Sequence, residues 1–425
     1  MKWRGIDSSA SKSVPHALRA FRYAAFRRFY AGQSVSIVGS WVQSIALSWL
    51  VYRLSGSTSL LGLTAFLTQA PILLLGPLAG GFIDRHDRKR VLLISQWALA
   101  AQATLLGVTV SLGVLQVTWL LIMAAVQGFI AAVETPARQS FLNVLVPERA
   151  DLPNAIALNS FLMNSGRFVG PAIAGTLLVH VQEGVAFLIN AFSFLAAIAA
   201  IASVPWRHEA GLAGGGTRQF QAFGAGISYA LSHRVPRTLL PIVAVVSFFA
   251  SPYVALMPAL VRESFDNSSE TLGYLVGAAG LGGLVGTATL AAWRDMKSLP
   301  RLTASACGTA GSSLLAFSFS EQYWLSLLCM PFIGFGIIVT AASVNVMLQT
   351  TTPEPIRARV IGLYLASFLG MAPFGALSAG LLAEITSVRV VLSLGGGTCM
   401  AASLAFAAWT WRASFDIPRG DARPM

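Results

Sequence analysis

The residue that most needs a chemical explanation is Arg167, which lies halfway along the apolar run 154–180. A charged side chain inside a membrane-spanning helix is costly, so it usually faces a cavity or a polar partner. A planar guanidinium in this position could bind an anionic or acceptor-rich ligand. It could instead brace its own helix through backbone carbonyls and neighbouring amides. The sequence shows no midplane carboxylate that would pair with Arg167, and it leaves both roles open.

A second group of charged residues lies where apolar runs end. Asp84, Arg85 and Arg88 belong to a short polar cluster between two apolar runs, and Glu134 and Arg138 follow a later run. Glu134 and Arg138 are one helical turn apart, and either of them could pair with the Asp84 loop to latch an inner gate. The alternatives are a basic cluster that only anchors the topology and a solvated inner rim.

Polar and aromatic side chains within the apolar runs complete a candidate binding site. Buried amides can contact a ligand, but they more often bond neighbouring helices, and rings more often pack. The candidate substrate-binding residues besides Arg167 are Gln43, Gln69, Gln127, Asn159, Asn345, Tyr364 and Phe368.

The patterns of common enzymes and ATP-driven proteins are missing from the sequence. Its five histidines are scattered, and it contains neither a phosphate-binding loop nor a His-Glu-x-x-His helix. The glycine cluster Gly280–Gly286 lies inside an apolar run and therefore favours a helix seam. The three cysteines lack the spacing of disulfide or metal clusters. We expect no enzymatic activity, no cofactor and no metal, so that energy has to come from a gradient.

These candidates must be positioned by membrane helices. The chain has 425 residues, of which 55% are hydrophobic and 11% charged, and its mean hydropathy is +0.68. A helix needs about 20 apolar residues to cross a bilayer. Twelve runs qualify, near 31–52, 60–82, 90–112, 115–134, 154–180, 185–204, 238–261, 271–293, 302–319, 322–348, 357–382 and 388–411.

The runs divide the chain into two halves of six spans. Val146-Pro147-Glu148 precedes the fifth run and Thr352-Pro353-Glu354 precedes the eleventh, so the halves echo each other. Basic and aromatic residues over 14–30 suit a helix lying on the membrane surface. The expected parts are an N-terminal cytoplasmic segment (1–30), a six-helix bundle (31–204), a cytoplasmic linker (205–237), a second six-helix bundle (238–411) and a cytoplasmic tail (412–425).

The positive charge of the chain is explained by its placement. The net charge is +12, yet the Lys and Arg residues fall in the inner segments, except for Arg53, Arg262 and Arg389 in outer loops and Arg167 within a span. Such asymmetry follows the positive-inside rule and predicts that both termini are cytoplasmic. It argues against nucleic acid as a partner. The first residues lack an apolar core with a cleavage site, so we expect no removed signal peptide.

One motif closely resembles the signature loop between spans two and three of the major facilitator superfamily. It runs from Gly76 through Gly80 to Asp84 and Arg85, and small residues there let helices approach closely beside a basic turn. Asp87 stands where the family usually has glycine. We expect this motif to act as a gate.

The fifth run and the segment before it carry the second resemblance. Gly166, Gly170 and Pro171 resemble the exporter signature of this superfamily, with Ala174 in place of its penultimate glycine. They suit a packing seam that rocks, or ordinary small-residue packing. The segment 134–148 resembles the branch that contains enterobactin exporters and macrolide efflux proteins.

The resemblance implies an all-α major facilitator fold with two pseudo-symmetric bundles and a substrate site between them. It further implies a monomeric secondary transporter of the inner (plasma) membrane that exports a small amphiphilic molecule, drug-like or siderophore-like, by proton-driven antiport. The usual Arg-x-x-x-Gly of span four is absent, since Ala124 precedes Gly128. Proton coupling therefore rests on resemblance alone. An importer or a lysophospholipid flippase on the same fold is the alternative.

Overall fold

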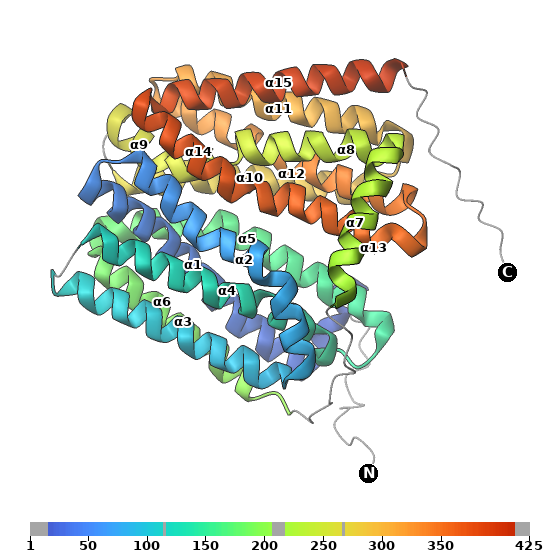
Figure 1. Cartoon of the computed structure of the whole chain (residues 1–425). Helices are drawn as coiled ribbons and strands as arrows, with labels where there is room; N and C mark the ends of the chain where they lie inside the picture. Colours follow the sequence, from blue (N-terminus) through green and yellow to red (C-terminus); the bar gives the residue numbers. More distant parts are fainter. Residues whose placement is uncertain (1–15, 114–115, 206–216, 266–267, 413–425) are drawn as a thin grey trace, which may run out of the picture.

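The computed structural model of the chain describes residues 16–113, 116–205, 217–265 and 268–412. Two groups of helices follow one another along the chain and lie one above the other (Figure 1). The first group consists of α1 (Ala24–Ser55), α2 (Thr58–Arg85), α3 (Arg88–Ser111), α4 (Val117–Leu145), α5 (Leu152–His180) and α6 (Glu183–Ala202), with the short turns η1 (His16–Arg22) and η2 (Arg149–Asp151).

The second group is similar, but two of its segments contain a π-helical turn. One segment joins α8 (Arg234–Val245), the π-turn η3 (Val246–Ala250) and α9 (Tyr253–Ser264), and another joins α13 (Glu354–Leu365), the π-turn η5 (Ala366–Gly370) and α14 (Met371–Ile385). The remaining elements are α10 (Ser269–Ala292), the turn η4 (Met296–Ser298), α11 (Leu299–Phe319), α12 (Tyr323–Thr351) and α15 (Val388–Arg412), and α7 (Thr217–Ser232) precedes the group.

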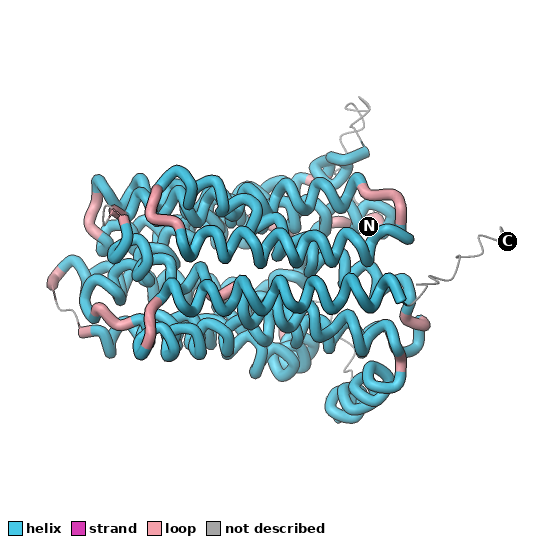
Figure 2. Tube along the Cα trace, turned by 90° about the horizontal axis from the view of Figure 1, so that it is seen from above, coloured by secondary structure: helices cyan, strands magenta, loops and turns pink. Residues whose placement is uncertain are grey.

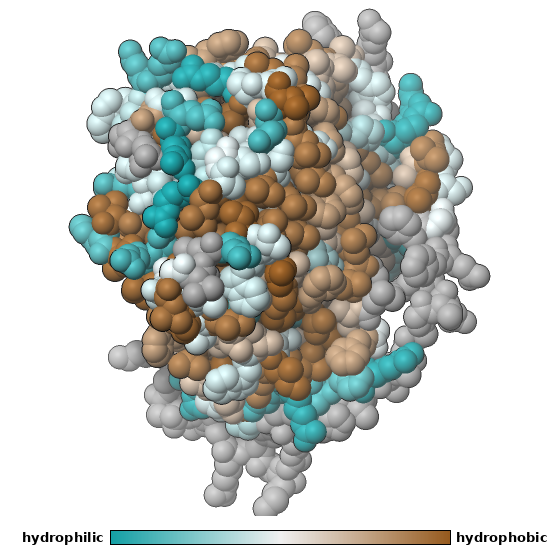
Figure 3. All heavy atoms as spheres, turned by 60° about the vertical axis from the view of Figure 1, so that its left-hand side comes forward, coloured by the Kyte–Doolittle hydropathy of each residue, from teal (hydrophilic) through white to brown (hydrophobic). Residues whose placement is uncertain are grey.

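The lengths and surfaces of these segments suit a bilayer. Ten segments of the described chain are long and apolar enough to cross a membrane, and α5 and α11, with 29 and 21 residues, complete twelve. Large apolar side chains such as Phe192 and Leu404 are exposed, and apolar atoms cover much of the face in Figure 3. Lipid contact accounts for such a surface, and helices satisfy their own backbone groups there. The expected all-α fold of two six-helix bundles is confirmed.

The structure differs from the expected boundaries in three places. α4 continues to Leu145, well beyond the apolar run that ends at 134, and it includes Pro136. Instead of one surface helix over 14–30, the short turn η1 leads into α1 at Ala24, and Ala20, Phe26 and Phe29 are buried. The expected linker contains α7, which packs on α13, while residues 206–216 lie outside the described chain. Hydropathy locates the membrane-spanning stretch of a helix, but a helix can continue beyond the bilayer.

The two π-turns lie beside each other in the second bundle. The Ser247 hydroxyl in η3 donates a hydrogen bond to the carbonyl of Phe368 in η5. A π-turn adds one residue to a helical turn and frees backbone groups, and such turns often occur at functional sites.

The helix connections gather at the two ends of the molecule (Figure 2). One end carries the α2–α3 connection with Arg85, Arg88, Lys89 and Arg90, and we call it the basic end. At the opposite end the bundles touch, so we call it the closed end. A Cβ atom built on Gly273 of α10 would lie only 2.5 Å from Cα of Gly175 in α5. Contact of backbones at this distance requires glycine on both helices.

Candidate functional site

A cavity of about 450 Å³ lies between the two bundles. Its walls come from α1, α2, α4 and α5 of the first bundle and from Ser251, α9, α10, α12, η5 and α14 of the second. Among the described residues, the hydrogen bonds that join the bundles lie at the closed end. These hydrogen bonds therefore seal the cavity at the closed end, whereas the described residues show no such bonds between the bundles at the basic end.

Arg167 extends into this cavity. Its side chain is exposed there, and it is the one charged residue among the described residues that line the walls. The backbone holds it firmly, because a Cβ on Gly280 of α10 would lie 2.5 Å from the Arg167 carbonyl oxygen. Aromatic rings of Trp41, Tyr253 and Phe368 also line the space. The cavity thus combines one cation with aromatic and aliphatic surface, which suits an amphiphilic molecule with a negative or acceptor-rich group.

The structure separates the predicted binding residues into two sets. Gln69, Gln127 and Phe368 line the cavity together with Arg167. The other four lie outside its wall, although Gln43 and Tyr364 contact the wall residues Gln127 and Phe368. They are Gln43, Asn159, Asn345 and Tyr364.

Gln43 illustrates why a buried amide need not be a ligand site. It is 1% exposed, and its Nε2 donates to Oε1 of Gln102 and of Gln127, each at 3.1 Å. Asn190 Nδ2 in turn donates to Gln43 Oε1 at 2.7 Å. This amide network joins α1, α3, α4 and α6 and holds Gln127 at the edge of the cavity.

The three remaining candidates have other surroundings. Asn345 Oδ1 accepts a hydrogen bond from Gln349 Nε2 at 3.0 Å, one turn along α12. Tyr364 is 5% exposed, and its ring stacks on that of Phe368 with the centroids 6.2 Å apart. Asn159 Oδ1 is buried without a hydrogen-bond partner. These three, with Gln43, do not line this cavity in the present conformation, and their contact with a ligand stays a prediction.

Several wall residues were missed by sequence reasoning. Trp41, Ser44 and Ser48 of α1 line the cavity, as do Thr64 and Thr68 of α2. A signal for them exists, since α1 has serine at every fourth position over 36–48 and therefore presents one polar stripe. In an apolar helix such a stripe marks the face that turns away from lipid.

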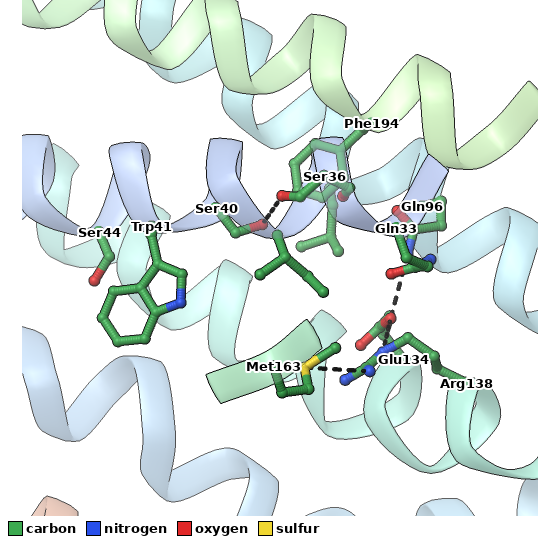
Figure 4. A pocket seen from close by; sticks show the side chains of 12 residues that line it. Gln33, Ser36, Ser40, Trp41, Ser44, Gln96, Glu134, Arg138, Met163 and Phe194 are labelled. Atoms are coloured by element: carbon green, nitrogen blue, oxygen red, sulfur yellow. Dashed lines mark hydrogen bonds and ion pairs between the residues drawn. The ribbon is translucent and has the colours of Figure 1, made fainter. Parts of the chain in front are cut away.

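A second, smaller chamber of about 260 Å³ lies within the first bundle (Figure 4). It contains the pair predicted from its spacing, with Arg138 Nε 3.0 Å from Glu134 Oε1. The two side chains are only 13% and 11% exposed, so they do not belong to a solvated rim. The expected partner, the side chain of Asp84, lies outside the described part of the chain.

The glycines of the first motif have an unexpected environment. A Cβ built on Gly76 or Gly80 would meet no described atom within 4 Å. The close helix approach expected at these positions is therefore not present in this conformation. Arg85 is exposed nearby, and Arg88 begins α3, whose N-cap Asp87 accepts a hydrogen bond from the Arg90 amide at 3.0 Å. Asp87 thus caps a helix at the position where the family usually has glycine.

The glycines of α5 pack tightly, but on two different partners. A Cβ on Gly166 or Gly170 would overlap Ile37 and Trp41 of α1, so these glycines form a seam inside the first bundle. Gly175 faces Gly273 of α10 across the boundary between the bundles. Pro171 is buried within the continuous helix α5. The expected seam exists, and its part between the bundles runs along α5 from Arg167 to Gly175.

A hydrogen-bonded clasp closes the far side of the cavity. Glu384 Oε2 near the end of α14 accepts from the Ser57 hydroxyl at 2.9 Å, the Thr58 hydroxyl at 3.0 Å and the Ser59 amide at 3.0 Å. A carboxylate at a helix N-terminus also interacts favourably with the helix dipole. We call this group the Glu384 clasp.

The comparisons with known proteins agree with this geometry. A family model described as transmembrane secretion effector matches residues 16–422. The staphyloferrin A transporter of Staphylococcus aureus is 24% identical over 89% of this chain and 94% of its own, and the enterobactin exporter of Shigella flexneri is 25% identical over 88% and 89%. A bacterial homologue of the iron transporter ferroportin, solved in an inward-facing state, superposes with a TM-score of 0.70 at 15% identity over 91% of this chain and 98% of its own.

The family match covers nearly the whole chain, and the relatives are transporters rather than enzymes. The predicted resemblance to the secretion branch of the major facilitator superfamily is therefore confirmed. This chain is a multi-pass membrane protein that takes a small-molecule substrate, and it belongs to the transmembrane secretion effector family of the major facilitator superfamily.

Proposed function

We propose that this protein exports a small amphiphilic anion across the plasma membrane by alternating access. The observation that carries the proposal is the cavity between the bundles, in which Arg167 supplies the one charge among the described wall residues. Its aromatic and aliphatic walls would take the apolar part of the cargo. The guanidinium would take a carboxylate or another acceptor-rich group through paired hydrogen bonds.

We further propose that the basic end faces the cytoplasm. The positive-inside rule supports this orientation, because Arg85, Arg88, Lys89 and Arg90 cluster at that end. The termini, the linker and the opening of the cavity are then cytoplasmic, and cargo enters from the cell interior. A single chain contains both bundles, so a monomer suffices for transport.

The cycle needs the basic end to close and the closed end to open. The small residues Gly76 and Gly80 face open space in the present state. In the opposite state they would allow α2 to pack against the second bundle, as glycines do elsewhere in this molecule. Asp84, together with Arg85 and Arg88, would hold that arrangement. The Glu384 clasp would hold the present one.

We propose a proton gradient as the driving force, on the basis of the family resemblance. The experiment is the accumulation of a siderophore and of an anionic dye in cells that overexpress the chain, with and without a protonophore. We expect cells that overexpress the chain to accumulate less of both compounds than control cells. The protonophore should remove this difference, and so should Arg167→Ala. Arg294→Ala removes an exposed arginine at the basic end and should leave export intact. Raised accumulation in overexpressing cells would show import and refute the proposed direction.

A further inference from the structure

The side chamber of the first bundle has features that its role in packing does not explain. It is lined by residues of α1, α3, α4, α5 and α6, and Figure 4 shows Gln33, Gln96, Glu134 and Arg138 grouped at one side of it. Gln96 Nε2 donates to Glu134 Oε1 at 3.2 Å, beside the bond from Arg138. Glu134 is thus a carboxylate held in the interior of a membrane bundle by an amide and a guanidinium.

Two amide atoms in this chamber lack hydrogen-bond partners. Gln33 is 3% exposed and Gln96 is 2% exposed, yet Gln33 Nε2 and Gln96 Oε1 make no hydrogen bond within the described structure. Leaving a buried polar atom unsatisfied costs about 1–3 kcal/mol. The chamber has room for water to satisfy both atoms, since a single water needs only about 10–15 Å³ of such space. Ser36, Ser40 and Ser44 extend this polar surface along α1.

The chamber is connected to the central cavity in two ways. Trp41 and Ser44 line both spaces. In addition, Arg138 Nη1 lies 3.6 Å from Sδ of Met163 on α5, and Arg167 follows Met163 one turn later on the same helix. A change at the ion pair can therefore reach the guanidinium of the central cavity through one rigid helix.

We propose that this chamber is the binding site of the coupling proton and that Glu134 carries it. The inference rests on the proposed function, since it supplies the proton site which gradient-driven export requires. Glu134 takes the proton from water when the closed end opens, and in the present state, where Arg138 pairs with the carboxylate, the acid gives the proton to water at the basic end, so that the proton moves inward as cargo moves outward. A metal cation such as Na⁺ fits less well, because the guanidinium of Arg138 already lies against the carboxylate and would repel a second full charge.

The direction of the effect follows from the charges around Glu134. α1 contributes Gln33 and serines to the chamber, α3 contributes Gln96, α5 contributes Met163 and α6 contributes Phe194. Among the described chamber residues the charged groups are thus Glu134 and Arg138, while Arg85 at the end of α2 and His86 next to it are exposed. Protonation of Glu134 leaves Arg138 as a buried cation without its carboxylate. That is costly, so proton binding disfavours the present conformation relative to one that hydrates Arg138 or pairs it elsewhere.

The test follows the opening of the basic end as a function of pH, without any cargo. Spin labels at Arg149 and Arg294, which are exposed at the basic end of the first and second bundle, report the distance between the bundles. For one coupled proton the ratio of open to closed molecules falls by up to about tenfold per pH unit as the pH is lowered. Glu134→Gln should abolish this dependence, and Glu134→Asp should retain it.

Controls separate this proposal from its alternatives. Glu354→Gln removes an exposed carboxylate at the basic end, outside the chamber, and should leave the titration unchanged. A wild-type distance that does not change with pH overturns the proposal, as does a titration that persists in a folded Glu134→Gln variant. A shift produced by Na⁺ at constant pH would assign the chamber to a metal cation and also overturn it. Because this readout needs no cargo, failure of the export assay in cells would not produce any of these results.

Discussion

The Glu384 clasp makes a quantitative prediction about the balance between conformations. Glu384→Ala removes the acceptor of the Ser57 and Thr58 hydroxyls and of the Ser59 amide, which all belong to the other bundle. Because the carboxylate is exposed, solvent weakens each bond, and we assign the clasp about 1–2 kcal/mol in total. Its loss should raise the ratio of molecules open at this end by about 5–30-fold.

Spin labels at Leu112 and Trp324 provide the assay for this prediction. Both side chains are highly exposed at the closed end, 71% and 75%, and they belong to different bundles. The long-distance population should increase in Glu384→Ala. Glu321→Ala is the matched control, because Glu321 pairs with Arg389 of its own bundle at 3.5 Å and joins nothing across the boundary. Equal distance distributions for Glu384→Ala and wild type would refute the role of the clasp.

Three further predictions concern the cavity and the seams. Arg167→Lys should weaken the transport of anionic cargo more than that of neutral cargo, because a point charge replaces a planar fork; equal losses in a competition assay would favour the bracing role. Gly175→Leu should reduce the amount of folded protein, because its Cβ would lie 2.6 Å from Cα of Gly273. Monodisperse elution in detergent measures this amount. Gly80→Leu should fold but fail to transport. Asp84→Asn should reach the membrane and stall cycling, and full transport by this variant would remove its gating role.

The number and order of the membrane helices could be predicted from the sequence for a physical reason. The bilayer sets the length of each apolar run, and helices are the way such runs satisfy their backbone groups. The same reasoning missed the continuation of α4 to Leu145, because a helix outside the bilayer has no hydropathy signal. It also missed the π-turns at Val246–Ala250 and Ala366–Gly370, which depend on packing within the bundle.

The rotation of each helix about its axis was harder to predict. Gln43 and Gln127 are both amides within the apolar stretch of a helix, yet one joins four helices and the other reaches the cavity. A helix that is apolar all round gives little indication of its inner face. Conformation adds a second difficulty, since Gly76 and Gly80 are packing residues by type but face open space in this state. The position of Arg167 in the cavity was predictable, because a charge within an apolar run usually faces either a cavity or a polar partner.

The most direct test of the central claim is uptake into inverted membrane vesicles, in which export appears as accumulation. The vesicles carry wild type or Arg167→Ala, and the cargo is an anionic amphiphile together with a neutral analogue. With an imposed proton gradient, we predict that wild-type vesicles accumulate the anion and that a protonophore abolishes this accumulation. Arg167→Ala should lower the apparent affinity for the anion by roughly 10–100-fold, which corresponds to about 1.5–3 kcal/mol for hydrogen bonds to a charged group. Equal uptake of the anion by both proteins would contradict the account.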